Sequence, residues 1–380
     1  MATDPRALIT RLDALKADRA STDVFWQEVA DYTLPSRSFT SSAPPGSRRS
    51  AARAFNSTPG LACEQLAGAL HGMLTSPSLR WFSLRARDPA MAEDQQVRAW
   101  YEHATERMYL TLTSTESNFD TAMHELYLDL CGFGSGVIFI ADRPDRGVYY
   151  EARPLAECYM AQGADGRIDT LIREWSLPLR EVHRLWPDAL PGALIERAQR
   201  TPDAPTTVVH AVIPRGGRWC SEYWLREPMT LLEDENDFKS FPFAAPRWAK
   251  RSGETYGFSP AMGALPDIKL LNRLEEMQLR AHAKAVDPVI LLPDDGFLNQ
   301  PTARPGGIMY FRAGAMGIDR IQALPSGRVD LGVDYIGQIQ ERIRRAFYIE
   351  WMNLPVQQGM TATEVLQRRD EMLRVLGPMV

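Results

Sequence analysis

The 380-residue sequence has little cysteine and no long apolar run, and each shortage excludes a class of protein. Its four cysteines form no CxxC pair and have no neighbouring histidine, which excludes a zinc ribbon and argues against a disulfide scaffold. No stretch approaches the roughly 18 apolar residues of a membrane span, so no membrane partner is expected. With 43 Lys and Arg against 48 Asp and Glu, the net charge of −5 excludes a globally basic nucleic-acid binder but not a local basic surface.

Catalytic motifs are missing as well. The six histidines show no metal-ligand spacing, and neither HExxH nor a Walker sequence occurs. Ser135 is not in a GxSxG elbow, because Phe133 and Val137 occupy the glycine positions. The run 132–136 (GFGSG) lies between a predicted helix and a predicted strand, the reverse of a dinucleotide fingerprint, which favours a structural corner. We therefore predict no catalytic residue, no cofactor and no metal.

One alternative of a different class stays open, a metal-dependent hydrolase built on the strand-rich middle of the chain. Its candidate ligands are four aspartates that a fold could bring together: Asp142, Asp145, Asp165 and Asp169. Acidic residues beside turns are usually turn formers, so this is the less favoured interpretation.

The apolar patterning predicts an α+β fold. Helical periodicity dominates the first 130 residues, and every apolar stripe there is interpreted as core, including Val97, Trp100, Ala104 and Met108. Short β-branched or aromatic runs follow at 137–141, 148–152, 158–161 and 167–175, with a hairpin turn at 163–166. Further strands are expected at 206–214, 218–227 and 242–249, around an acidic run, 233–237, that we interpret as a solvated loop.

Two long helices are predicted in the last third of the chain. The first starts at Ser259-Pro260, where serine can cap the helix, and continues to Val286. A Pro- and Gly-rich insert separates it from the second helix, which carries the stripe Ile336, Ile339, Ile343 and Phe347. Two such helices form an antiparallel pair that carries the insert away from the body. A further helix is expected from Thr361.

The first long helix carries four cations on one side. At about 100° per residue, Lys269, Arg273, Arg280 and Lys284 fall within about 60° of one another. Glu276 lies in the same stripe and can form ordinary helix-surface pairs with Arg273 or Arg280. For this helix alone a solvated face is the simpler interpretation, but a ring of copies would multiply weak, sequence-independent phosphate contacts.

Five segments, taken together and in order, resemble the head-to-tail connector, or portal, protein of short-tailed bacteriophages. They are 26–35 (WQEVADYTLP), 55–82 (FNSTPGLACEQLAGALHGMLTSPSLRWF), 126–136 (LYLDLCGFGSG), 246–269 (PRWAKRSGETYGFSPAMGALPDIK) and 360–377 (MTATEVLQRRDEMLRVLG). Each is only moderately specific alone.

The resemblance implies a non-enzymatic subunit of a twelve-membered ring with wing, stem, clip and crown parts. Mapped onto this chain, it implies a wing at 1–258, stem helices at 259–286 and 327–350, and a small α/β clip at 287–326. A tunnel loop at 351–360 and a wing helix at 361–380 would follow, and the crown of the family is absent from this sequence.

The implied partners are those of a portal in the virion, assembled in the host cytoplasm and set at one capsid vertex. They are further copies of the chain, the major capsid protein, the terminase large subunit, head-tail adaptor or tail proteins, a scaffold protein and double-stranded DNA bound without sequence preference. The expected DNA-channel residues are the four helix cations and the uncharged tunnel loop, Asn353, Leu354, Pro355, Val356, Gln357 and Gln358. For that loop, an ordinary helix connector is the alternative.

Overall fold

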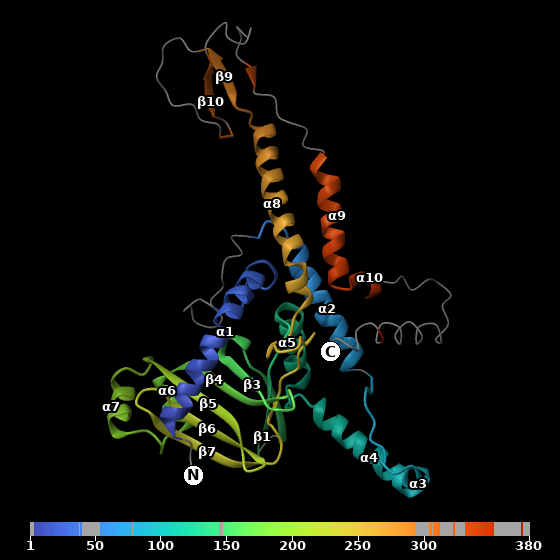
Figure 1. The fold of residues 1–380 in the computed structure, drawn as a ribbon, viewed down its shortest axis with the longest axis vertical. Helices are drawn as coiled ribbons and strands as arrows, with labels where there is room; N and C mark the ends of the chain where they lie inside the picture. Colours follow the sequence, from blue (N-terminus) through green and yellow to red (C-terminus); the bar gives the residue numbers. More distant parts are fainter. Residues whose placement is uncertain are drawn as a thin grey trace.

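The computed structural model describes residues 4–37, 39, 54–77, 79–143, 147–293, 304–305, 307–311, 322–323, 331–352 and 374. The described part of the chain contains both helices and strands, so the expected mixed helix-and-strand fold is confirmed. Figure 1 shows a body of helices and sheets from which two long helices rise toward a small sheet at the far end.

Three helices form the centre of the body. They are α1 (Pro5–Thr33), α2 (Thr58–Leu74) and α5 (Phe119–Phe133). The two apolar stripes predicted before Pro35 belong to one continuous helix, α1, which begins at its Asp4 cap. Trp26 is fully buried among the three helices, and its Nε1 donates a hydrogen bond of 3.0 Å to the carbonyl oxygen of Phe133. This core supports the base of the long helices.

A five-stranded antiparallel sheet in the order β3-β4-β5-β6-β7 forms the other part of the body. Its strands are β3 (Cys158–Gln162), β4 (Ile168–Pro178), β5 (Pro205–Arg215), β6 (Arg218–Leu225) and β7 (Thr230–Phe238), and the short 3-10 helix η1 (Leu155–Glu157) precedes them. The hairpin turn predicted between β3 and β4 is confirmed, with Gly166 at φ 74°.

Both faces of this sheet are covered. Leu8 and Leu12 of α1 pack with Val209 on one face, whereas Val208 packs on the other face beside α6 (Leu179–Leu185) and α7 (Gly192–Arg200). Successive strand residues point to opposite faces, so neighbouring valines of β5 serve two different cores.

The acidic run 233–237 is not the loop that we predicted from the sequence. It lies inside β7, the edge strand of the five-stranded sheet. Edge strands tolerate charged residues because charge discourages pairing with foreign strands. An acidic run therefore does not exclude a strand at a sheet edge.

The strand predicted at 242–249 is also wrong in extent. The observed strand β8 (Phe243–Ala244) pairs with β1 (Ile138–Arg143), which pairs in turn with β2 (Gly147–Ala152). Pro242 and Pro246 flank β8 and lack the main-chain N–H that a longer ladder would need.

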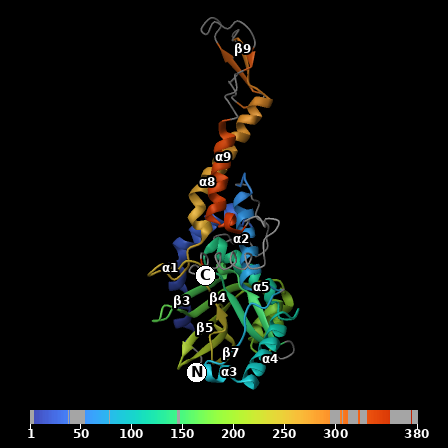
Figure 2. The same cartoon turned by 90° about the vertical axis from the view of Figure 1, so that its right-hand side faces the viewer.

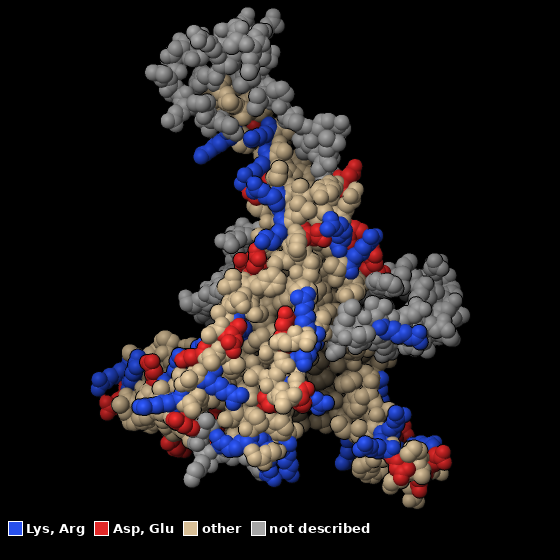
Figure 3. Space-filling model, in the orientation of Figure 1, with Lys and Arg blue, Asp and Glu red and all other residues tan. Residues whose placement is uncertain are grey.

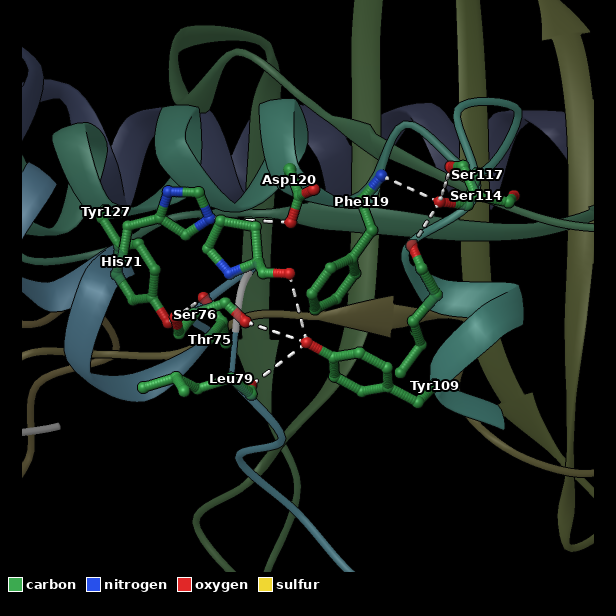
Figure 4. Close-up of polar contacts among 12 residues, drawn as sticks. His71, Thr75, Ser76, Leu79, Tyr109, Ser114, Ser117, Phe119, Asp120 and Tyr127 are labelled. Carbon is green, nitrogen blue, oxygen red and sulfur yellow. Dashed lines mark hydrogen bonds and ion pairs between the residues drawn. The ribbon is translucent and has the colours of Figure 1, made fainter. Parts of the chain in front are cut away.

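Two helices, α3 (Pro89–Glu93) and α4 (Gln95–Leu112), project sideways from the body (Figure 1). The core role predicted for the α4 stripe is wrong, because Trp100 is 64% exposed and Met108 is 47% exposed. Helical periodicity shows which residues share a face, not what covers that face. The Tyr109 hydroxyl anchors α4, lying 3.1–3.3 Å from the carbonyl oxygens of Ser76, Pro77 and Leu79 (Figure 4).

The long helices are α8 (Pro260–Val286) and α9 (Leu331–Ala346), which lie side by side in both views (Figures 1 and 2). Beyond them, β9 (Ile290–Pro293) pairs parallel with β10 (Ile308–Phe311) and antiparallel with β11 (Gln322–Ala323). The described part of the insert is thus a small sheet held at the tip of a helix pair, as the sequence predicts.

The second long helix ends before the predicted residue 350. It ends at Ala346, Tyr348 adopts a left-handed backbone conformation with φ 58°, and a separate short helix, α10 (Ile349–Met352), follows. A non-glycine residue at positive φ interrupts helical hydrogen bonding. The helix predicted to continue to residue 350 therefore breaks at Tyr348.

Candidate functional site: the α8 and α9 helix pair

The base of α8 is fixed by side-chain capping and by a close backbone crossing. Ser259 Oγ accepts a hydrogen bond of 3.0 Å from the Met262 N–H and donates one of 2.8 Å to the Gly132 carbonyl oxygen. Gly134 ends α5 at φ +73°, and a Cβ on it would lie 2.5 Å from the Gly257 carbonyl oxygen. The glycine run 132–136 is thus the helix-to-strand corner that the sequence predicts, and the structure shows in addition that it packs against the start of α8.

An apolar seam and an ion pair to α8 hold α9 in place. Ile339, Ile343 and Phe347 are completely buried, and Ile336 is almost so, which confirms the predicted stripe. Arg342 of α9 lies 2.6 Å from Asp267 of α8. The seam therefore fixes which side of α8 faces α9.

The four predicted cations are all exposed on α8. At about 100° per residue they lie roughly 100–160° around the helix from Asp267, which pairs with α9. Figure 3 shows Lys and Arg side chains along one edge of the column that the long helices form. Two of the four cations share one carboxylate: Glu276 lies 2.8 Å from Arg273 and also pairs with Arg280. The helix-surface pairs expected from the sequence are therefore present.

The two end members of this stripe differ in their surroundings. Lys269 pairs with Glu28 of α1, and that hydrogen bond and charge raise the pKa of Lys269. Lys284 is exposed near the far end of α8 and has no ion pair within the part of the chain that the structure describes. The free positive charge of the stripe therefore increases toward the far end.

Exposed apolar residues flank the cations on both sides. Met277 is 55% exposed on one flank, and Leu279 and Val286, 53% and 86% exposed, lie on the other. At about 100° per residue these flanks lie roughly 80–100° from Lys269 in opposite directions. Upper α8 thus presents a charged stripe between two apolar flanks, with α9 behind it.

Other predicted site residues fall elsewhere. The tunnel-loop residues 353–358 and the helix expected from Thr361 lie outside the described residues, apart from Arg374, which is helical. Among the candidate metal ligands, Asp165 accepts a hydrogen bond from the Arg167 N–H at 3.0 Å, as a turn former does. Asp145 lies outside the described residues, and within them no three His, Cys, Asp or Glu side chains cluster to hold a metal ion.

Sequence reasoning missed two buried ionisable groups. Arg19 donates hydrogen bonds to the carbonyl oxygens of Leu155 and Ala156, at 2.9 and 2.7 Å, and so ties α1 to the short helix η1 that precedes β3. Asp129 of α5 lies 3.2 Å from Arg37, yet burial raises its pKa to about 6. Both residues hold the body together rather than forming part of the exposed helix pair.

Among the described helices, none is both long and apolar enough to cross a membrane.

Comparison with known proteins gives one family and two curated relatives. A family model described as "Bacteriophage head to tail connecting protein" matches residues 6–380. The chain is 30% identical over 416 residues to the "Probable portal protein" of Bordetella phage BPP-1, and 25% identical over 401 residues to the "Portal protein" of Salmonella phage epsilon15. Each alignment covers 100% of this chain and 71% of the relative.

Two solved particles give weaker matches. They are the neck of an empty gene transfer agent particle and the virion of a native one, each 10% identical to the chain. The TM-scores are 0.37 and 0.32, with coverage of 84% and 70% of this chain and of 73% and 65% of the chains matched.

Proposed function

This chain belongs to the family of bacteriophage head-to-tail connecting proteins, and from that membership we propose how its parts carry out the portal role. Members of the family are structural proteins of the phage particle and not enzymes. Twelve copies form a ring at one capsid vertex, and double-stranded DNA enters and leaves the head through it. Residues 1–258 form the wing, α8 and α9 the stem, and the insert 287–326 the clip.

The exposed face of α8 lines the channel, and the distribution of its side chains supports this proposal. With α9 covering one side and apolar residues on both flanks, the natural neighbours of each α8 are the α8 helices of the adjacent copies. That packing buries Met277 against the Leu279 and Val286 flank of the next copy and leaves the cations facing the axis.

The charge balance fits a channel through which DNA slides. Twelve copies of a chain with net charge −5 carry about −60, so DNA does not adhere to the ring as a whole. Only a few cations per copy face the DNA, and Glu276 partly neutralises two of them. Weak, sequence-independent phosphate contacts guide DNA without gripping it.

The remaining segments are assigned by their position along the helix pair. The clip at the tip binds the terminase large subunit during packaging and adaptor or tail proteins afterwards, while the wing contacts the major capsid protein. A scaffold protein assists assembly in the host cytoplasm. The uncharged loop 353–358 contacts DNA through bulk and hydrogen bonds.

The test of this proposal is DNA packaging by capsids that contain the double variant Arg273→Glu/Arg280→Glu. We expect complete rings but roughly tenfold less packaged DNA, because the channel loses its phosphate contacts. The matched control is Arg184→Glu, which breaks the same kind of i, i+3 pair, with Glu181 at 2.7 Å, on the exposed helix α6. Packaging equal to that of the control would contradict a channel role for the stripe.

A further inference from the structure

Residues 80–86 run along α4 without joining a sheet. Phe82 lies against Tyr109 and Leu84 against Thr105, so two residues of the segment span one turn of the helix, as in an extended chain. Their side chains alternate as in a strand: Phe82, Leu84 and Ala86 are half-buried, whereas Ser83 and Arg85 are exposed. Within the described part of the chain, the main chain of residues 81–86 makes one hydrogen bond, from the Leu84 N–H to Thr105 Oγ1 at 2.9 Å. The segment therefore has the form of a strand with an open edge.

This open edge is held firmly in place. The Trp81 ring is stacked on Phe119 with ring centroids 6.1 Å apart, and Phe82 lies 6.2 Å from Tyr109. The Tyr109 hydroxyl fixes the chain just before the segment, at the carbonyl oxygen of Leu79 (Figure 4). A pre-ordered strand edge binds another strand at a lower entropic cost than a flexible loop does.

A cavity of about 270 Å³ lies between this segment and helices α3 and α4. Its apolar lining comes from both sides, from Leu84 and Ala86 of the segment and from Ala92, Val97 and Tyr101 of the helices. The volume is close to the lower end of the ~300 Å³ and upward range of ligand pockets, which suits a side chain better than a whole cofactor.

The lining of the cavity carries more positive than negative charge. Arg80, Arg85 and Arg98 line it together with a single acidic residue, Glu102. Arg80 lies 3.9 Å from Glu106, an exposed pair of little strength. Arg85 is exposed and has no ion pair with any residue that the structure describes.

We propose that this edge and cavity form a docking site for an extended, acidic segment of another protein. The segment adds as a strand to residues 81–86, places one apolar side chain in the cavity and presents flanking carboxylates to Arg85 and Arg98. The phosphates of a nucleic acid can pair with the arginines, but a nucleic acid cannot add as a strand to an open edge or place an apolar side chain in the cavity. The combination therefore favours a peptide.

The probe is a library of short random peptides, panned against the purified full chain. We expect enrichment of peptides with Asp or Glu directly beside Leu, Ile, Phe or Met, because Arg85 and its apolar neighbours Leu84 and Ala86 point to opposite faces of the segment. A short DNA duplex should not compete with them. Enrichment without an acidic and apolar pattern, or full competition by DNA, would overturn the proposal.

Two charge variants then locate the site. Arg85→Glu should weaken the enriched peptides roughly tenfold, whereas Arg87→Glu, an exposed neighbour that does not line the cavity, should change affinity by less than about twofold. Peptides with Lys in place of the acid should bind Arg85→Glu better than wild type. Equal effects of Arg85→Glu and Arg87→Glu on peptide affinity would refute the site. A third variant, Ala92→Phe, fills the cavity and should weaken peptide binding as much as Arg85→Glu does.

Discussion

Gly134 and Gly257 cross backbone to backbone at the base of α8, so closely that a Cβ on Gly257 would lie 2.0 Å from the Gly134 carbonyl oxygen. The Trp248 N–H donates a hydrogen bond of 2.8 Å to the same oxygen. This contact joins the end of α5 to the segment that leads into α8. The orientation of the long helix pair relative to the body therefore depends on two positions without side chains.

We expect Gly134→Ala to lower the free energy of unfolding by roughly 3 kcal/mol, since it combines a left-handed backbone with a steric clash. Gly216→Ala is the matched control, because Gly216 also has a positive φ, +59°, but open space where a Cβ would lie. Its cost should be roughly 1–2 kcal/mol, from backbone strain alone. Urea unfolding measures both, and equal losses would show that the crossing contributes nothing.

The buried carboxyl of Asp129 should make stability depend on pH in the opposite sense from an ordinary ion-paired aspartate. Burial raises its pKa in the folded protein from 3.8 to about 6, despite the nearby Arg37. Between these values the folded state binds a proton that the unfolded state has released, so stability falls as pH rises. The difference between the two pKa values corresponds to roughly 3 kcal/mol of unfolding free energy.

The measurement is the free energy of unfolding of wild type and Asp129→Asn across this range. From pH 4 to pH 6 the free energy of unfolding of wild type should fall by roughly 3 kcal/mol relative to that of Asp129→Asn. Above pH 6 the difference between the two proteins should stay constant. Asp203→Asn, which changes an exposed carboxylate, controls for the loss of one charge. A constant difference between Asp129→Asn and wild type at all pH values would contradict a raised pKa.

Substitutions at Ile343 and at Leu279 should affect different properties, the stability of the subunit and the assembly of the ring. Ile343 of α9 is completely buried, so Ile343→Ala should cost roughly 2–5 kcal/mol of unfolding free energy. Leu279 of α8 is 53% exposed in the subunit, so Leu279→Ala should change that free energy by less than about 0.5 kcal/mol. It should nevertheless reduce the fraction of rings in native mass spectrometry. If rings persist unchanged, this flank of α8 is not an interface.

Deletion of residues 354–358 tests the tunnel loop. Because these residues carry no charge and follow α9 and α10 in the sequence, we expect rings to form normally while capsids lose packaged DNA more readily. DNA retained after nuclease treatment of purified heads measures the effect. Retention equal to that of wild type would assign these residues to an ordinary helix connector.

The sequence predicts α8 and α9 well because local chemistry determines them. Ser259 and Pro260 fix the start of α8, and the buried stripe of α9 follows helical geometry. The placement of the cations on one side of α8 follows from the same geometry. The ion-pair partners of these cations do not all follow from helical geometry, because Glu28, which pairs with Lys269, is 241 residues away in the sequence.

The predictions that failed concern what surrounds an element. The stripe on α4 is apolar, but Trp100 is 64% exposed, and periodicity carries no information on what covers a stripe. Burial of Arg19 could not be anticipated either, because it depends on carbonyl groups more than a hundred residues away, at Leu155 and Ala156. Tertiary packing decides such cases.

The most direct test of the proposed channel is an electron-microscopy reconstruction of the assembled ring. It should place Arg273, Arg280 and Lys284 of α8 nearer to the rotation axis than Ile339 and Ile343 of α9 in the same copy. Finding α9 between α8 and the axis, or the cations on the outer wall of the ring, would contradict the account.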